Sequence, residues 1–113
     1  MTNYKQGDLI LFPFPFDDFS GAKKRPALIV GNARSKVGAY IVAKVTSALR
    51  SDSHSFILNN ADLSIATPLP CEVRCNELMT ISEQIIVKKL STLDKSALEQ
   101  LTQQVQKNFD VVK

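Results

Sequence analysis

The sequence predicts a small α+β domain, in which a strongly bent antiparallel sheet is followed by one helix. Short β-branched or aromatic stretches between Gly, Pro and Asn turns occupy most of the chain, and helical spacing of apolar residues occurs only near its end. The chain has 113 residues, of which 44% are hydrophobic and 22% charged. This length supports a modest core without disulfides or metal, so we expect residues 1–113 to form a single domain.

The predicted strands are short and separated by turn residues. In the first, from Leu9 to Phe14, Phe12 and Phe14 share a period of two with Phe16, and we expect this face to enter the core. A proline at the start of the second strand is compatible with pairing. The other strands are expected at Pro26–Val30, Gly38–Thr46, Ser55–Leu58, Cys71–Ile81 and, as a short last strand, Ile85–Val87.

The C-terminal segment has a different period. Its apolar residues recur every three or four positions, which predicts an amphipathic helix over Asp94–Asn108 that closes one face of the sheet. Ser91 or Asp94 can serve as the N-cap. The residues of the apolar stripe are Ala97, Leu98, Leu101, Val105, Phe109 and Val112.

Charge and cysteine content limit the function classes. The net charge of +3 and the pI of about 9.0 permit nucleic-acid binding without requiring it. Cys71, Cys75 and the single His54 cannot supply a zinc ligand set, so no metal is expected. Because Cys71 and Cys75 are four residues apart in one strand, we expect buried, reduced thiols in a cytoplasmic protein. Neither a signal peptide nor a membrane span is expected.

The most distinctive local feature is a run of cations between the first two strands. Lys23, Lys24 and Arg25 are consecutive, and Pro26 follows them directly. A phosphate-bearing partner would explain this crowding of like charge, although a solvated loop is the alternative for any such triplet. Pro26 restricts Arg25 to extended backbone conformations. His54 lies among polar residues and is expected on an exposed loop rather than in a catalytic site.

Four blocks of sequence, taken together, resemble one family. They are GDLILFPF…GAKKRPALIV, then VAKVTS, then VRCNELMTI, then KKLSTLDKSALEQL. In order and spacing they are similar to the MazF/PemK (Kid) toxins over nearly the whole chain. The resemblance implies an SH3-like β-barrel with a C-terminal helix, a homodimer, and a type II toxin that cuts single-stranded RNA without a metal ion or cofactor.

The resemblance also implies catalytic roles for three residues. Arg25 matches the arginine before the proline, and a guanidinium can offer two donors to a phosphorane that carries extra negative charge. Thr46 and Ser47 match a TS pair at a strand end, where a hydroxyl can bind a phosphate oxygen. The alternative for such a hydroxyl is to cap the next segment. Arg74 matches the arginine that assists cleavage in the Kid branch.

The chain departs from that branch beside Arg74. Asn76 stands where the Kid branch has an acidic residue, and an amide cannot usefully accept a proton near neutral pH. Glu77 is the next residue, but a shift of one residue along a strand points to the opposite face. We expect Glu77 to reach the site only if the segment turns helical. Asp17, in the first loop, is the alternative base.

The first loop is expected to contribute to RNA binding. Lys23 and Lys24 would attract the phosphate backbone, and Asp17 would alter the sequence preference. Phe16 lies at the loop edge, where it could stack on a base, although a core role is the simpler interpretation.

Together with the resemblance, these features predict a metal-independent, sequence-specific endoribonuclease that cuts single-stranded RNA (mRNA) and leaves 2′,3′-cyclic phosphate and 5′-hydroxyl ends. The alternatives are a toxin that binds a protein, as gyrase inhibitors do, or a weakened toxin that acts mainly in autoregulation. The expected partners are single-stranded RNA, a second copy of the chain and an acidic antitoxin, with DNA reached only through the antitoxin.

Overall fold

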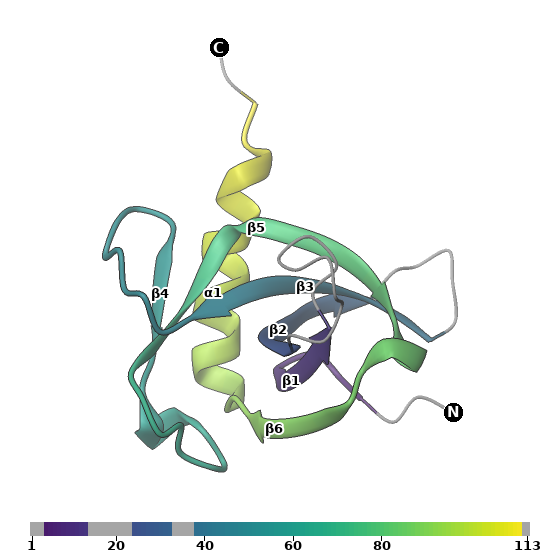
Figure 1. The fold of residues 1–113 in the computed structure, drawn as a ribbon. Coiled ribbons are helices and arrows are strands. Elements are labelled where there is room, and N and C mark those ends of the chain that lie inside the picture. The colour runs from purple at the N-terminus through teal and green to yellow at the C-terminus, as the bar shows by residue number, and fades with distance from the viewer. Residues whose placement is uncertain (1–3, 14–23, 33–37, 112–113) are drawn as a thin grey trace.

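The computed structural model describes residues 4–13, 24–32 and 38–111. Its strands form one antiparallel sheet of six strands that curls into a half-barrel, and one α-helix packs against it (Figure 1). The order across the sheet is β4-β5-β3-β2-β1-β6. The elements are β1 (Asp8–Pro13), β2 (Lys24–Asn32), β3 (Ala39–Thr46), β4 (Ser55–Leu58), β5 (Cys71–Ser82), β6 (Lys88–Thr92) and α1 (Lys95–Gln106), with single 3₁₀ turns at Asn60–Asp62, Glu83–Ile85 and Lys107–Phe109.

Alternating side chains build an apolar cluster on each face of the sheet. The larger cluster lies beneath α1 and includes Leu9, Leu28 and Val45. The smaller one lies on the other face and includes Phe12, Ala27, Val42 and Tyr40. Phe12 is fully buried, as its period-two position predicts, whereas Phe14 and Phe16 lie outside the described residues.

The C-terminal helix forms where helical spacing predicts it. Asp94 is the N-cap, and its side chain accepts a hydrogen bond of 2.8 Å from the backbone N–H of Ala97. Ala97, Leu101 and Val105 are buried against the sheet. The predicted stripe is wrong at Phe109, which is 69% exposed in the 3₁₀ turn that follows the helix. Val112 lies outside the described residues.

The predicted last strand, Ile85–Val87, is wrong. The chain makes a 3₁₀ turn at Glu83–Ile85, where Ser82 caps the backbone N–H of Gln84, and the strand that follows is β6. Strand β6 pairs with β1 at the edge of the sheet. Lys88 and Lys89 are exposed and interrupt the apolar alternation from which strands are predicted. Lysines on an edge strand also discourage pairing with other chains.

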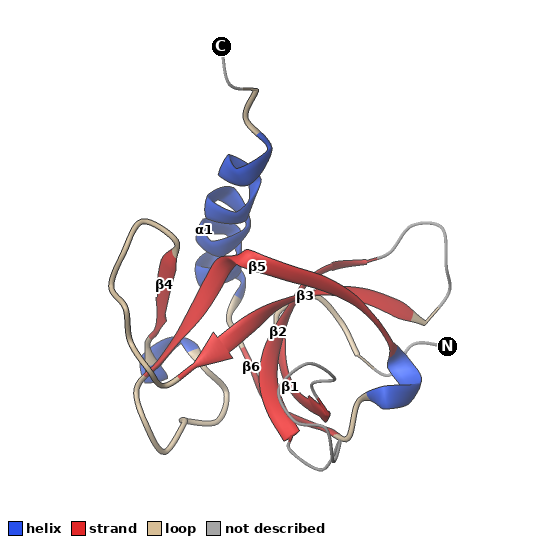
Figure 2. Cartoon of the chain, turned by 45° about the horizontal axis from the view of Figure 1, so that its top comes forward, coloured by secondary structure: helices blue, strands red, loops and turns tan. Residues whose placement is uncertain are grey.

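Strand β5 is the longest strand, and it bends sharply in the middle (Figure 2). Val73 pairs with Val45 and Leu78 pairs with Ala43, so residues 74–77 of β5 stand opposite Lys44 alone. This irregularity is a β-bulge, which breaks the simple alternation of faces and increases the local twist. It falls on the VRCNEL segment that the sequence singles out.

The two thiols are both free, as predicted, and they differ in burial. Cys75 is 1% exposed, and its pKa is raised to about 11 mainly because burial disfavours the thiolate. Cys71 is only partly buried, so the prediction that both are buried is wrong for Cys71. Among the described residues, no helix has the length and apolar character needed to cross a membrane.

Candidate functional site

Arg25 and Thr46 lie at neighbouring strand ends and face a common pocket. Strands β2 and β3 pair Ala27 with Lys44, and Arg25 and Thr46 each lie two residues beyond that pair on their strands. The pocket has a volume of about 390 Å³. Its polar lining includes Arg25, Lys44, Thr46, Ser47 and Thr67, and its apolar wall is formed by Leu9, Leu11, Pro26, Val45, Pro68, Leu69, Cys71 and Leu90.

The Thr46 hydroxyl has a defined orientation. Its oxygen accepts a hydrogen bond of 3.0 Å from the backbone N–H of Ala48. This contact is the capping role that a strand-end hydroxyl can have, and it is compatible with binding. A hydroxyl that accepts one hydrogen bond retains its own O–H, which can donate to an anionic oxygen in the pocket.

Lys44 connects this pocket with a second one. The second pocket has a volume of about 220 Å³ and lies beside the smaller apolar cluster, with Phe12, Ala27 and Glu77 in its lining. Lys44 lines both pockets, and its Nζ lies 3.9 Å from Oε1 of Glu77. Lys44 is therefore a residue common to both linings, and its ammonium lies beside a carboxylate of the second pocket.

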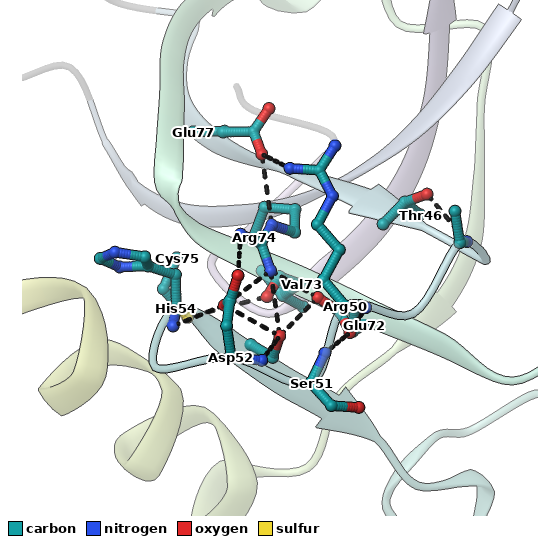
Figure 3. A network of polar contacts seen from close by, with 12 residues as sticks. Thr46, Arg50, Ser51, Asp52, His54, Glu72, Val73, Arg74, Cys75 and Glu77 are labelled. Carbon is teal, nitrogen blue, oxygen red and sulfur yellow. Dashed lines mark hydrogen bonds and ion pairs between the residues drawn. The ribbon is translucent and has the colours of Figure 1, made fainter.

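Arg74 is buried and does not line either pocket. Its guanidinium donates to both carboxylate oxygens of Asp52 at 3.0 Å, to Glu72 at 2.6 Å, to Ser55 at 3.0 Å and to Glu77 at 3.2 Å (Figure 3). The hydrogen bonds that Arg74 donates to the carboxylate of Asp52 and, next in effect, to that of Glu72 raise the pKa of Arg74 above its ordinary value. The Arg74 hydrogen bond in turn holds the pKa of the Asp52 carboxyl well below its usual range.

Glu72 is fully buried beside Arg74. Burial alone would raise its pKa, but hydrogen bonds from the Ser55 hydroxyl, from Arg74 and from the backbone N–H groups of Ser51 and Arg50 outweigh that effect and lower the pKa to about 2. The carboxylate thereby ties the loop between β3 and β4 to strand β5. Removal of any one partner from this buried network would leave an uncompensated charge and destabilise the folded state.

Glu77 lies beside Arg74 and Lys44, a position that the alternation of faces along a regular strand does not predict. Asn76 is exposed and Glu77 is half-buried, so adjacent residues do point in different directions. The segment does not turn helical. The bulge instead brings Arg74 and Glu77 to the same side, although residues three apart in a regular strand point to opposite faces.

The other predicted site residues are dispersed. Ser47 is exposed and lines the Arg25 pocket, and Lys24 is exposed at the start of β2. Phe16, Asp17 and Lys23 lie outside the described residues. His54 is exposed, as predicted. No group of three or more His, Cys, Asp or Glu side chains within residues 4–13, 24–32 and 38–111 could hold a metal ion.

Sequence reasoning did not identify Lys44, Arg50, Asp52 or Glu72. For Lys44 a signal was present, because it is two residues before Thr46 in a predicted strand and therefore shares its face. The other three depend on contacts between the β3–β4 loop and the bulge of β5, which local patterns do not encode.

Comparison with the sequence profiles of protein families identifies one family. The sequence profile of the PemK-like, MazF-like toxins of type II toxin-antitoxin systems matches residues 5–109. A comparison with curated proteins gives no match. Among solved structures, similar chains include a mycobacterial endoribonuclease in complex with its cognate antitoxin (TM-score 0.75, 12% identity, 97% of this chain and 98% of that chain covered).

Two further solved structures share the fold. Toxin MazF-mt6 of Mycobacterium tuberculosis aligns with a TM-score of 0.70 and 19% identity, covering 94% of this chain and 99% of that chain. The MazE-MazF structure from Deinococcus radiodurans aligns with a TM-score of 0.71 and 15% identity, covering 96% and 97%. Since the family profile covers nearly the whole chain, this protein belongs to the PemK-like, MazF-like toxins of type II toxin-antitoxin systems.

Proposed function

We propose that this protein is an endoribonuclease that cuts single-stranded RNA without a metal ion. The observation that carries the proposal is the pocket shared by Arg25 and Thr46, with Lys44 beside them. Fixed cationic and hydroxyl donors on strand ends suit a phosphodiester, because they are in place before charge develops. The structural neighbours described as endoribonucleases support the same activity.

The proposed reaction uses the donors in the pocket. The 2′-oxygen of a ribose attacks the adjacent phosphorus, and the proton of the 2′-hydroxyl passes to a base. The bond to the 5′-oxygen of the next nucleotide breaks, and that oxygen takes up a proton from water. The products are a 2′,3′-cyclic phosphate and a 5′-hydroxyl. Arg25 stabilises the charge that accumulates on the non-bridging oxygens, and the Thr46 O–H donates to one of them. Ser47 and Lys24 extend the contact along the strand.

Arg74 contributes to this site indirectly. Its guanidinium is already engaged by three carboxylates and is 3% exposed, which leaves it poorly placed to touch RNA. It holds Glu77 by a hydrogen bond of 3.2 Å, and Glu77 lies beside Lys44. The proposed contribution of Arg74 is therefore to position groups at the pocket.

The proposed partners are a second copy of the chain and an acidic antitoxin. Neighbours of this fold have been crystallised with an antitoxin, and the basic character of the chain suits an acidic ligand. DNA would be reached only through that antitoxin, and the proposed location is the cytoplasm.

The test is cleavage of single-stranded RNA in excess chelator, followed by analysis of the ends. We expect unchanged cleavage rates with and without chelator, together with 2′,3′-cyclic phosphate and 5′-hydroxyl ends. Loss of cleavage in the chelator would contradict the metal-free reaction. Binding to a topoisomerase without any RNA cleavage would favour the protein-binding toxin, an alternative that the exposed Asn76 at the Kid acidic position keeps open.

A further inference from the structure

We propose that Arg50 is a second phosphate-binding residue, which exchanges Glu77 for an RNA phosphate next to the cleavage pocket. This inference rests on the proposed ribonuclease function. Arg50 belongs to the loop that follows Thr46, and no part of the sequence pattern marks it as functional. The structure assigns it through three features: how its backbone is held, where its side chain points, and how weakly that side chain is paired.

A buried anion holds the backbone at Arg50 and Ser51. The N–H groups of Arg50 and Ser51 both donate to Oε1 of Glu72, at 2.9 and 3.3 Å. Ser51 adopts φ 49°, a left-handed conformation that is uncommon for residues other than glycine. Such a conformation persists where surrounding contacts determine it, and here those contacts come from Glu72. The position of Arg50 is therefore set before any ligand arrives.

The side chain of Arg50 extends from this loop toward the bulge of β5. Figure 3 shows its guanidinium beside the carboxylate of Glu77. Glu77 also lies beside Lys44, the cation that lines both pockets. A strand of RNA with one phosphate between Arg25 and Thr46 would carry its neighbouring phosphates toward Lys44 and Arg50.

The bonds around Glu77 differ in strength, and that difference permits an exchange. The hydrogen bond from Nε of Arg74 is 3.2 Å long, and its donor is 4% exposed. The ion pair with Arg50 is 3.8 Å long with an arginine side chain that is 58% exposed, and the pair with Lys44 is 3.9 Å long. Long ion pairs between solvent-accessible side chains contribute little to stability. Arg74 thus anchors Glu77, while Arg50 can leave it for a phosphate at little cost.

The test measures binding of a single-stranded RNA whose 2′-hydroxyls are all methylated, so that it cannot be cleaved. Fluorescence anisotropy over a range of salt concentrations gives the affinity and its salt slope. Arg50→Ala should lower the affinity about fivefold at low salt and reduce the slope by about 0.7, the change expected for one lost phosphate contact on a single strand. Arg50→Lys should retain most of the slope.

Two further variants isolate the exchange. Lys95→Ala removes one positive charge from an exposed position at the start of α1 that lines neither pocket, and it should leave both affinity and slope unchanged. Glu77→Gln keeps an acceptor for Arg74 but removes the charge that competes for Arg50, so it should tighten RNA binding. Thermal unfolding of each variant verifies that it is folded.

The outcomes separate this inference from the function on which it rests. If the wild type binds the methylated RNA and Arg50→Ala matches it in affinity and slope, the inference is overturned and the ribonuclease proposal survives. Weaker binding by Glu77→Gln would overturn the exchange, because it would make Glu77 an RNA contact. If the wild type neither binds nor cleaves RNA, both the Arg50 inference and the ribonuclease proposal are overturned.

Discussion

At the scale of the residue, two arginines of the same chemistry have opposite surroundings. Arg25 is half-buried in the lining of a pocket with Thr46, and Arg74 is enclosed by carboxylates. Both arginines lie in sequence blocks that resemble the family, so the resemblance implies a catalytic role for each. Their surroundings distinguish a guanidinium that can meet a substrate from one that organises its neighbours.

Substitution of Arg25 tests this distinction. Arg25→Ala should lower kcat by about 10²–10³-fold, the usual effect of removing one donor to a developing oxyanion. Arg25→Lys should restore little, because an ammonium lacks the planar fork that gives two parallel hydrogen bonds. Initial rates on a fixed RNA give kcat and KM. A variant Arg25→Ala that cleaves at the wild-type rate would exclude the role.

At the scale of the element, the site depends on one irregular strand and one regular helix. The bulge of β5 bends the strand and brings Arg74 and Glu77 to one side. On its other edge β5 keeps its register with β4, and the backbone N–H of Cys75 donates to the carbonyl of His54 at 2.9 Å. The helix α1 covers the larger apolar cluster, and Asn108 just after it donates to the carbonyl of Cys75 at 2.6 Å. The helix thus supports the bulge from behind.

The N-cap of α1 offers a test of that support. Asp94→Ala removes the acceptor for the N–H of Ala97 and should lower the free energy of unfolding by about 1 kcal/mol, whereas Asp94→Ser should retain most of it. Urea titration measures both variants. Equal stability of the wild type and Asp94→Ala would show that the cap contributes nothing to the fold.

At the scale of the whole molecule, the buried ionic network makes stability depend on pH. The folded-state pKa of Glu72 is lowered from 4.5 to about 2, and that of Asp52 is lowered too. A carboxyl group with a lowered folded-state pKa binds protons more readily when unfolded, so its contribution is complete above the unfolded pKa and disappears as the pH falls toward the folded pKa. The network therefore stabilises the protein fully at neutral pH.

The expected result is a loss of stability that begins as the pH falls through about 4.5 and continues toward about 2. Urea titrations at a series of pH values give the free energy of unfolding. Asp52→Asn removes one of the titrating groups and should make this decline shallower. If the free energy of unfolding declined with falling pH in the same way for the wild type and Asp52→Asn, the Asp52–Arg74 pair would not stabilise the folded state.

The sequence by itself determined the elements and their kind. Local patterns predicted most strands, the helix and two candidate N-caps, Ser91 and Asp94, of which the structure uses Asp94. They missed β6, whose edge lysines obscure the alternation. Arg25 and Thr46 could be identified from family resemblance, and Lys44 from its shared face with Thr46.

Only the tertiary structure decided which of these residues meet. The pairing of β2 with β3 brings Arg25 and Thr46 to one pocket, although they are far apart in the chain. The bulge of β5 and the loop tied to Glu72 give Arg74, Glu77 and Arg50 their neighbours. Register and bulges arise from packing between distant strands, and buried ion pairs form only when folding removes water from both partners at once.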